Sequence, residues 1–217
     1  MAELPTGYLA RPPQVRDAVA IAEVVKALDI ADYGEPDFTH EDLLDDWMRP
    51  RFELADDAWV LTGPTGRIIG YAYVWESQPD AELEADAYVL PEYAGRGLGG
   101  QLLEIIETRA QAICAGRSMT IGIFASGANE EKRNLLERRG FAFVRSVLRM
   151  RIDLRREPVD DAAMPAGVVI GPLDPDDLET VRGVWLDAFS EHGLFSPRRM
   201  DEWLASRFDH LAFDSSL

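Results

Sequence analysis

Four glycines in a run of six residues, at positions 95, 97, 99 and 100, follow a short apolar segment that ends at Val89. Glycine reaches backbone dihedral angles closed to other residues, and it carries no side chain that would keep a ligand away from the backbone N–H groups. The pattern after the turn predicts a helix, whose positive N-terminus would then lie at the glycines. The segment therefore predicts a cradle for a phosphate or pyrophosphate that needs no metal.

The helix after the glycines has one apolar face, which predicts that it packs on a core. That face consists of Leu98, Leu102, Ile105, Ile106 and Ile113. A nucleoside-triphosphate loop is excluded, because no Lys-Ser/Thr pair follows the last glycine. A dinucleotide site needs a second strand ending in an acid about 20 residues on, where this chain still has a helical pattern that ends near Cys114. The alternative is that the glycines form only a tight turn.

Residues 83–114 resemble the acetyl-CoA signature of the GNAT N-acetyltransferase superfamily, in which a strand is followed by Val-x-Pro-x-Tyr, by Arg/Gln-x-x-Gly-x-Gly/Ala and by a helix. The first basic or amide position of that signature is Ala94 here, so one side-chain contact is lost and the backbone cradle remains. The resemblance implies that acetyl-CoA is the cosubstrate. Its binding residues would be Ala87, Val89, Ala94, Gly95, Arg96, Gly97, Leu98, Gly99 and Gly100.

A second segment resembles the family's Asn…Leu-Tyr-x-x-x-Gly-Phe helix through Asn129, Leu135, Leu136 and the pair Gly140-Phe141. The resemblance implies that Asn129 contacts the pantetheine arm of acetyl-CoA. Leu136 stands where the family has the tyrosine that protonates the leaving thiolate. We therefore consider Ser126 and Tyr93 as the proton donor, although both are also suitable turn residues.

Acetyl transfer to an amine also requires polarisation of the thioester and removal of a proton. The resemblance implies that the backbone N–H near Val89 donates to the acetyl carbonyl, where negative charge develops. An alkylamine has a pKa near 10.4 and is mostly protonated at neutral pH, so a base is needed. Strand alternation places Glu82, Glu84 and Asp86 on one face, which lines either the substrate cleft or solvent. Glu84 is our first candidate for the base.

A fourth candidate for the base comes from the turn. Glu92 lies in the glycine turn, and the family's frequent catalytic glutamate positions hold Leu83 and Phe124 here. His40, His192 and His210 lack metal-ligand spacing, so no metal is expected.

Composition excludes several classes of protein. The net charge of −17 argues against nucleic acid and anionic membranes as partners, because their binding proteins carry clustered Lys and Arg. The sequence shows neither a run of 18 apolar residues nor a basic-then-apolar order at Met1–Thr6, so we expect a soluble cytoplasmic protein. One cysteine, Cys114, excludes an internal disulfide framework.

The predicted elements alternate between strands and helices. Strands are expected at 8–11, 58–62, 67–75, 83–89 and 119–124, with a long strand or a bent pair of strands at 141–154. Helices are expected at 15–28, 39–47, 98–114 and 129–139. This order matches the GNAT fold, an α/β fold with a central, mostly antiparallel mixed sheet flanked by helices. Residues 1–155 would form one complete domain.

Residues 156–167 predict a linker, and residues 168–217 resemble the start of the first domain repeated. In this repeat a strand is expected at 168–170, and Asp174-Pro175-Asp176-Asp177 would precede an amphipathic helix. Trp47 and Trp203 are 156 positions apart, as are the Arg-Phe pairs at 51 and 207. The arrangement resembles the tandem GNAT domains of mycothiol synthases, with the second domain incomplete. The apolar stripe of that amphipathic helix, formed by Val181, Val184, Trp185 and Phe189, then needs a covering surface, either the first domain or a second copy of the chain in a homodimer.

Two functions remain open from the sequence. The first is an acetyl-CoA-dependent N-acetyltransferase that acts on the amine of a small molecule, which the glycine cradle and Asn129 favour. The second is a catalytically silent GNAT module that binds acyl-CoA or a partner domain as a scaffold, which Ala94 and Leu136 favour.

Overall fold

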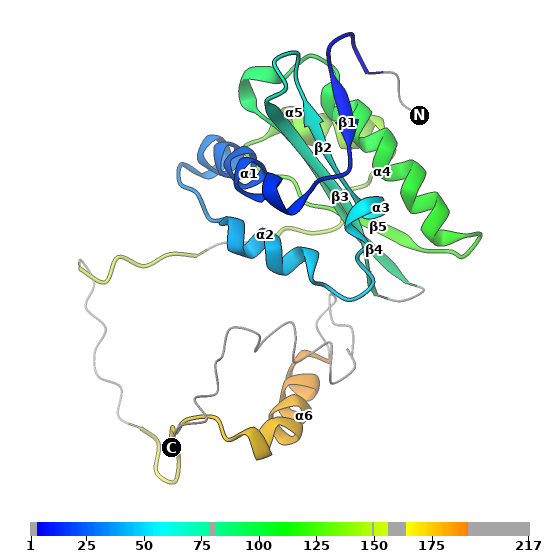
Figure 1. The fold of residues 1–217 in the computed structure, drawn as a ribbon. Coiled ribbons are helices and arrows are strands. Elements are labelled where there is room, and N and C mark those ends of the chain that lie inside the picture. The colour runs from blue at the N-terminus through cyan, green and yellow to red at the C-terminus, as the bar shows by residue number, and fades with distance from the viewer. Residues whose placement is uncertain (1–3, 79–80, 149, 156–163, 191–217) are drawn as a thin grey trace. The chain divides into compact units, whose positions relative to one another are not determined.

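The computed structural model describes residues 4–78, 81–148, 150–155 and 164–190 (Figure 1). The chain divides into two compact units, Met1–Ala142 and Phe143–Leu217, which are treated separately. The predicted linker and the domain boundary at residue 155 remain predictions. The glycine turn and every predicted site residue lie in the first unit.

The first unit is built on one five-stranded sheet in the order β1-β2-β3-β4-β5. The strands are β1 (Leu9–Arg11), β2 (Ala58–Thr62), β3 (Ile68–Gln78), β4 (Glu82–Val89) and β5 (Thr120–Ile123). Neighbouring strands are antiparallel except β4 and β5, which are parallel. The mixed, mostly antiparallel sheet predicted from the sequence is confirmed.

The predicted helices of the first unit form with small shifts at their ends. They are α1 (Ala18–Tyr33), after a 3-10 turn at Val15–Asp17, α2 (His40–Trp47), α4 (Leu98–Cys114) and α5 (Glu130–Arg138). Thr39 and Asp42 cap α2 reciprocally, as their spacing predicts. Helix α1 runs five residues beyond the predicted end and stops at Gly34, which has a left-handed conformation. A short helix, α3 (Leu54–Asp57), was not predicted.

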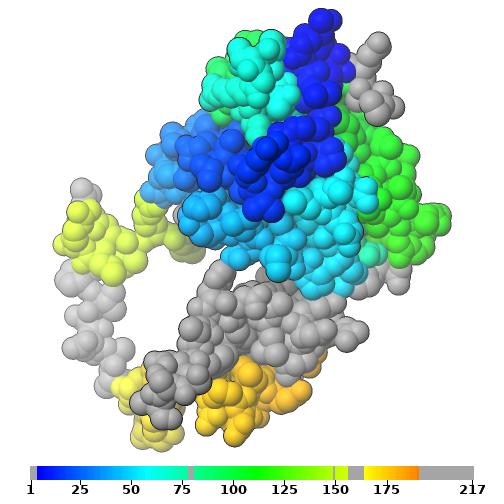
Figure 2. All heavy atoms as spheres, viewed as in Figure 1, coloured from blue at the N-terminus to red at the C-terminus, as the bar shows by residue number. Residues whose placement is uncertain are grey.

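Successive side chains of β4 point to opposite faces of the sheet, and each face packs against a core. Leu83 and Ala85 are buried against α4, in a core that includes Leu102 and Ile106. On the opposite face, Tyr71 of β3 belongs to a second core with residues of α1 and α2. Helices α1 and α2 lie over the near face of the sheet in Figure 1, and their side chains cover it in Figure 2. The face that carries the β4 acids is therefore largely covered by protein.

Two ion pairs join different elements of the first unit, and the second of them joins elements that are distant in sequence. Arg11 of β1 contacts Asp17 at 2.7 Å, and its hydrogen bond lowers the pKa of that carboxyl. Arg109 of α4 contacts the buried Asp57 of α3 at 2.7 Å. Removing one partner of such a buried pair leaves an uncompensated charge, so these contacts fix how the helices sit on the sheet.

The second unit corrects two of the strand predictions. No strand forms at the described residues of 141–154 or at 168–170. The side chains of Phe143 and Leu148 are 79% and 82% exposed. A strand gains stability only by pairing its backbone and burying one face, so an alternating pattern without a partner remains irregular.

The helix predicted after Asp174 is confirmed as a 3-10 turn at Pro175–Asp177 followed by α6 (Leu178–Phe189). Trp203 and the Arg-Phe pair at 207 lie outside the described residues. Within the described part of the chain, no helix is long and apolar enough to cross a membrane.

Candidate functional site

The parallel strands β4 and β5 stay paired over only half of β4. Glu82–Ala85 pair with Thr120–Ile123, and β4 then continues to Val89 without β5 beside it. The Leu90 amide donates to Ile69 O at 2.9 Å, so alternation directs the amides of Ala87 and Val89 away from β3. The Ala87 amide donates to Asp86 Oδ1 at 2.7 Å. The Val89 amide therefore points to the side that β5 has left, as a donor to a bound carbonyl must.

The glycine turn has the backbone that its sequence predicts. After a 3-10 turn at Pro91–Tyr93, Gly95 and Gly97 have φ angles of +71° and +79°, and Gly97 is the N-cap of α4. No atom lies within 4 Å of a Cβ built at either glycine, so the turn is open on that side. A Cβ at Gly99 would lie 3.2 Å from Leu135 Cδ2, so this glycine allows α5 to pack on α4.

One cation is anchored at the turn. The Arg96 guanidinium donates to Glu92 O at 3.1 Å and to Tyr8 Oη at 3.3 Å, and it lies 4.8 Å from the centre of the Tyr93 ring. Ala94 and Leu98 flank the turn without adding a polar side chain. A bound anion would meet the N-terminus of α4 together with the exposed guanidinium of Arg96.

Ser126 and Asn129 lie in the loop between β5 and α5. Asn129 Oδ1 caps α5 by accepting from the Lys132 amide at 3.0 Å, and Asn129 Nδ2 donates to Asp32 of α1 at 3.3 Å. Ser126 is buried, and its Oγ accepts from the Ala128 amide at 3.2 Å. Both side chains thus also hold the loop in place.

Leu136, at the position of the family tyrosine, belongs to the core under α4 and is 8% exposed. The side chain fills space there, so the position offers no void for a proton donor.

The acids of β4 differ in their surroundings. Glu84 Oε1 accepts from Tyr73 Oη at 3.1 Å and lies 3.4 Å from Arg49 Nη1, and its side chain is partly exposed. Asp86 is buried and paired with Lys132 of α5. Glu92 is exposed and contacts Arg67 at 3.3 Å. Glu84 is thus the more accessible of the two carboxylates held on the sheet beside α2.

Three tyrosines, Tyr71 and Tyr73 of β3 and Tyr88 of β4, lie on the same face of the sheet as these acids. The Tyr71 ring lies 6.0 Å from that of Tyr73 and 6.3 Å from that of Tyr88, and Trp47 Nε1 donates to Tyr71 Oη at 2.9 Å. Burial raises the pKa of Tyr73 and of Tyr88 well above the usual value. The hydroxyls therefore remain protonated and act as donors. Sequence reasoning missed this cluster, although the alternation Tyr71-x-Tyr73 marks one face of a strand.

Helix α2 adds an acid that sequence reasoning also missed. Burial raises the pKa of Asp46 to about 6, while its ion pair with Arg49 opposes the shift. Arg49 also lies 4.7 Å from the centre of the Trp75 ring. This arrangement connects α2 to Glu84 through one arginine.

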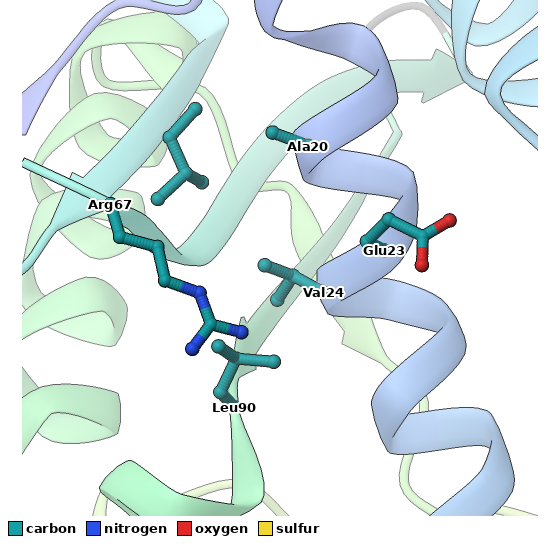
Figure 3. A pocket seen from close by; sticks show the side chains of 6 residues that line it. Ala20, Glu23, Val24, Arg67 and Leu90 are labelled. Carbon is teal, nitrogen blue, oxygen red and sulfur yellow. The ribbon is translucent and has the colours of Figure 1, made fainter.

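A separate cavity of about 350 Å³ lies between α1 and the start of β3 (Figure 3). It is lined by Ala20, Glu23, Val24, Arg67, Ile68 and Leu90. Both charged residues have partners elsewhere, since Glu23 pairs with Lys26 at 3.1 Å and Arg67 pairs with Glu92. The cavity contains none of the β4 acids.

The separation of β4 from β5 and the glycine turn before α4 both lie in a region that matches a known protein family. Residues 55–142, which hold both, match the family model described as an acetyltransferase (GNAT) domain. Residues 55–142 correspond to a GNAT acetyltransferase domain. The matched region ends at the same residue as the first compact unit.

The chain is similar to bacterial mycothiol acetyltransferases. The protein from Frankia casuarinae is 34% identical over 147 residues, which are 66% of this chain and 41% of that protein. The one from Thermomonospora curvata is 27% identical over 184 residues, 83% of this chain and 55% of that protein. This chain spans about half the length of these relatives.

Solved structures confirm the GNAT fold. A GCN5-related N-acetyltransferase from Sphaerobacter thermophilus is 26% identical with a TM-score of 0.74, covering 94% of this chain and 64% of that one. A putative acetyltransferase from Salmonella typhimurium, solved with its cofactor acetyl-CoA, is 23% identical with a TM-score of 0.50. The match covers 63% of this chain and 80% of that one.

Proposed function

We propose that this chain transfers the acetyl group of acetyl-CoA to the amine of a small molecule. The observation that carries the proposal is the Val89 amide directed away from β3, next to an open glycine turn at the N-terminus of α4. The GNAT domain and the similarity to mycothiol acetyltransferases support it. A cytoplasmic location, where acetyl-CoA is made and used, is part of the proposal.

The residues present fit acetyl-CoA. The pyrophosphate would accept from the backbone amides of Gly95–Gly100 at the N-terminus of α4, with Arg96 as the nearby cation. The acetyl carbonyl would accept from Val89, and the pantetheine arm would run along Ala87 towards Asn129. Among the described residues, no group of three or more His, Cys, Asp or Glu side chains is placed to hold a metal ion.

The chemical step is direct transfer. The neutral amine nitrogen attacks the thioester carbon, the C–N bond forms, the C–S bond breaks, and CoA leaves as a thiolate. The Val89 amide stabilises the negative charge that develops on the carbonyl oxygen. We assign proton removal from the amine to Glu84, directly or through water, because its carboxylate is partly exposed while Asp86 is buried against Lys132.

The thiolate must take up a proton after the transfer. We assign this step to the Ser126 hydroxyl, whose oxygen already accepts from a backbone amide and whose hydrogen remains available for donation. Because a serine hydroxyl is a far weaker acid than an alkyl thiol, whose pKa is near 8.5, Ser126 acts as a relay. It gives its hydrogen to the thiolate while it takes up a proton from water, so the hydroxyl is regenerated.

The test measures free CoA thiol released by the full chain from acetyl-CoA over a panel of small amines. Glu84→Gln should reduce the rate by about 10²–10⁴-fold, the usual contribution of a general base. The matched control is Glu92→Gln, which changes an exposed acid in the turn and should leave the rate within a factor of about two, since its ion pair is worth little. Equal rates for Glu84→Gln and the wild type would remove Glu84 from the mechanism.

A further inference from the structure

Lys132 occupies an unusual place for a lysine. It is the third residue of α5, where a positive charge opposes the helix dipole. Its side chain is 17% exposed and reaches Asp86, which is 8% exposed, while its ammonium lies 5.3 Å from the centre of the Tyr88 ring. The stability of α5 does not explain a lysine at this position. We therefore look for the explanation in the contacts of its ammonium.

The choice of lysine rather than arginine is also informative. The chain has 20 arginines and two lysines, Lys26 and Lys132. A guanidinium is a flat fork with five donors, whereas a lysine ends in a methylene and a compact ammonium, the same group that a primary alkylamine presents. One of the two lysines thus places a primary ammonium in a largely enclosed position.

The surroundings of that ammonium are those of a recognition site for a cation. Asp86 supplies a carboxylate that is fixed by the Ala87 amide at 2.7 Å, and Tyr88 supplies the π face of its ring. Tyr88 is adjacent to Val89, whose amide is the proposed partner of the acetyl carbonyl. An ammonium at this point therefore lies beside the end of β4 where transfer would occur.

We propose that Asp86 and Tyr88 form the ammonium-binding subsite for the acceptor, and that Lys132 fills it until the acceptor displaces it. The inference rests on the proposed function and adds a substrate class, a primary amine on an unbranched methylene. Asp86 binds the incoming ammonium, and proton removal remains with Glu84. Lys132 determines specificity, because an acceptor must compete with it for Asp86.

Lys132→Ala removes three methylenes and the ammonium, which together correspond to n-propylammonium. The full-length variant should bind added n-propylammonium about 10–100-fold more tightly than the wild type, the range for a charge-assisted hydrogen bond with a cation–π contact. Calorimetry and thermal shift without acetyl-CoA measure this binding. Lys26→Ala is the matched control, since it removes an exposed ion-paired lysine of α1 and should bind as the wild type does.

Loss of Lys132 leaves a buried carboxylate uncompensated, which destabilises the variant and can prevent it from folding without the amine. In that case n-propylammonium should restore the native circular dichroism, and n-propanol and tetramethylammonium should not. The double variant Lys132→Ala/Asp86→Asn, which has no buried charge, should fold and fail to bind the amine.

Two results would overturn the inference: equal affinity of Lys132→Ala and Lys26→Ala for n-propylammonium, or unchanged binding in the double variant. Acetylation of n-propylamine is measured separately. Tight binding to Lys132→Ala without acetylation supports the subsite and counts against the transferase proposal, so the two failures are distinguishable.

Discussion

Gly97→Glu places a carboxylate at the N-cap of α4, where the structure leaves the turn open. Gly97 has a φ angle of +79°, and no atom lies within 4 Å of a Cβ built there. Any other residue pays about 1–2 kcal/mol for this left-handed backbone. The new carboxylate would also face the pyrophosphate of bound acetyl-CoA.

The electrostatic part of this effect is the larger one. Two like charges about 5 Å apart at an effective dielectric constant of about 20 repel by about 3 kcal/mol. That energy corresponds to a loss of affinity of about 100-fold or more. Gly97→Lys carries the same backbone strain with the opposite charge, so it should bind acetyl-CoA better than Gly97→Glu by at least this factor.

Gly116→Glu provides the matched control for strain. Gly116 has a φ angle of +88° with open space around its Cβ, and it follows the opposite end of α4. Both glutamate variants should lower the melting temperature by about 2–8 °C, while only Gly97→Glu should lose acetyl-CoA binding in calorimetry. Equal affinities of the two glutamate variants would refute the assignment of the pyrophosphate to this turn.

Three further predictions test the surroundings of the site. Gly70→Ala should destabilise the chain by about 1–3 kcal/mol in chemical denaturation, because the new Cβ would lie 2.8 Å from Tyr88 O. Gly127→Ala is the control and should leave stability unchanged, because no atom lies within 4 Å of a Cβ built there. Leu136→Tyr should also cost about 1–3 kcal/mol and give no faster CoA release, and a rate gain in a stable variant would show that the ring reaches the thiolate. Asp46 has a pKa of about 6 in the folded chain and about 3.9 in the unfolded chain, so the native state binds more protons between these pH values. The free energy of unfolding should therefore fall as the pH rises from about 4 to 6. Asp46→Asn should remove this fall in melting temperature, and an unchanged pH profile would contradict the assignment.

Local sequence signals predicted most of the first unit. A run of apolar and β-branched residues predicted β2 at its observed bounds. The Thr39–Asp42 spacing predicted the start of α2, and the glycines predicted the turn before α4. Each of these signals depends on residues that are close in sequence, so it can be recognised without knowledge of the fold. The strand expected at 141–154 shows the limit, because alternation indicates which face is apolar and not whether a partner strand exists.

The details of the acid cluster depend on contacts between distant residues. Asp86 and Lys132 are 46 positions apart, and their pairing follows from the packing of α5 beside β4. Similarly, Tyr71 meets Tyr88 through the register of β3 and β4. The sequence identified the acids as one face of a strand, and only the fold shows that Asp86 is already occupied while Glu84 is partly open.

The most direct test of the proposed function is mass spectrometry of the amine after incubation of the full chain with ¹³C-acetyl-CoA. We predict a labelled acetyl group on a primary amine, formed in proportion to the chain added and lost in Gly97→Glu. Tight binding of acetyl-CoA without a labelled product from any primary amine would contradict the transferase and would identify the domain as a silent acyl-CoA-binding module.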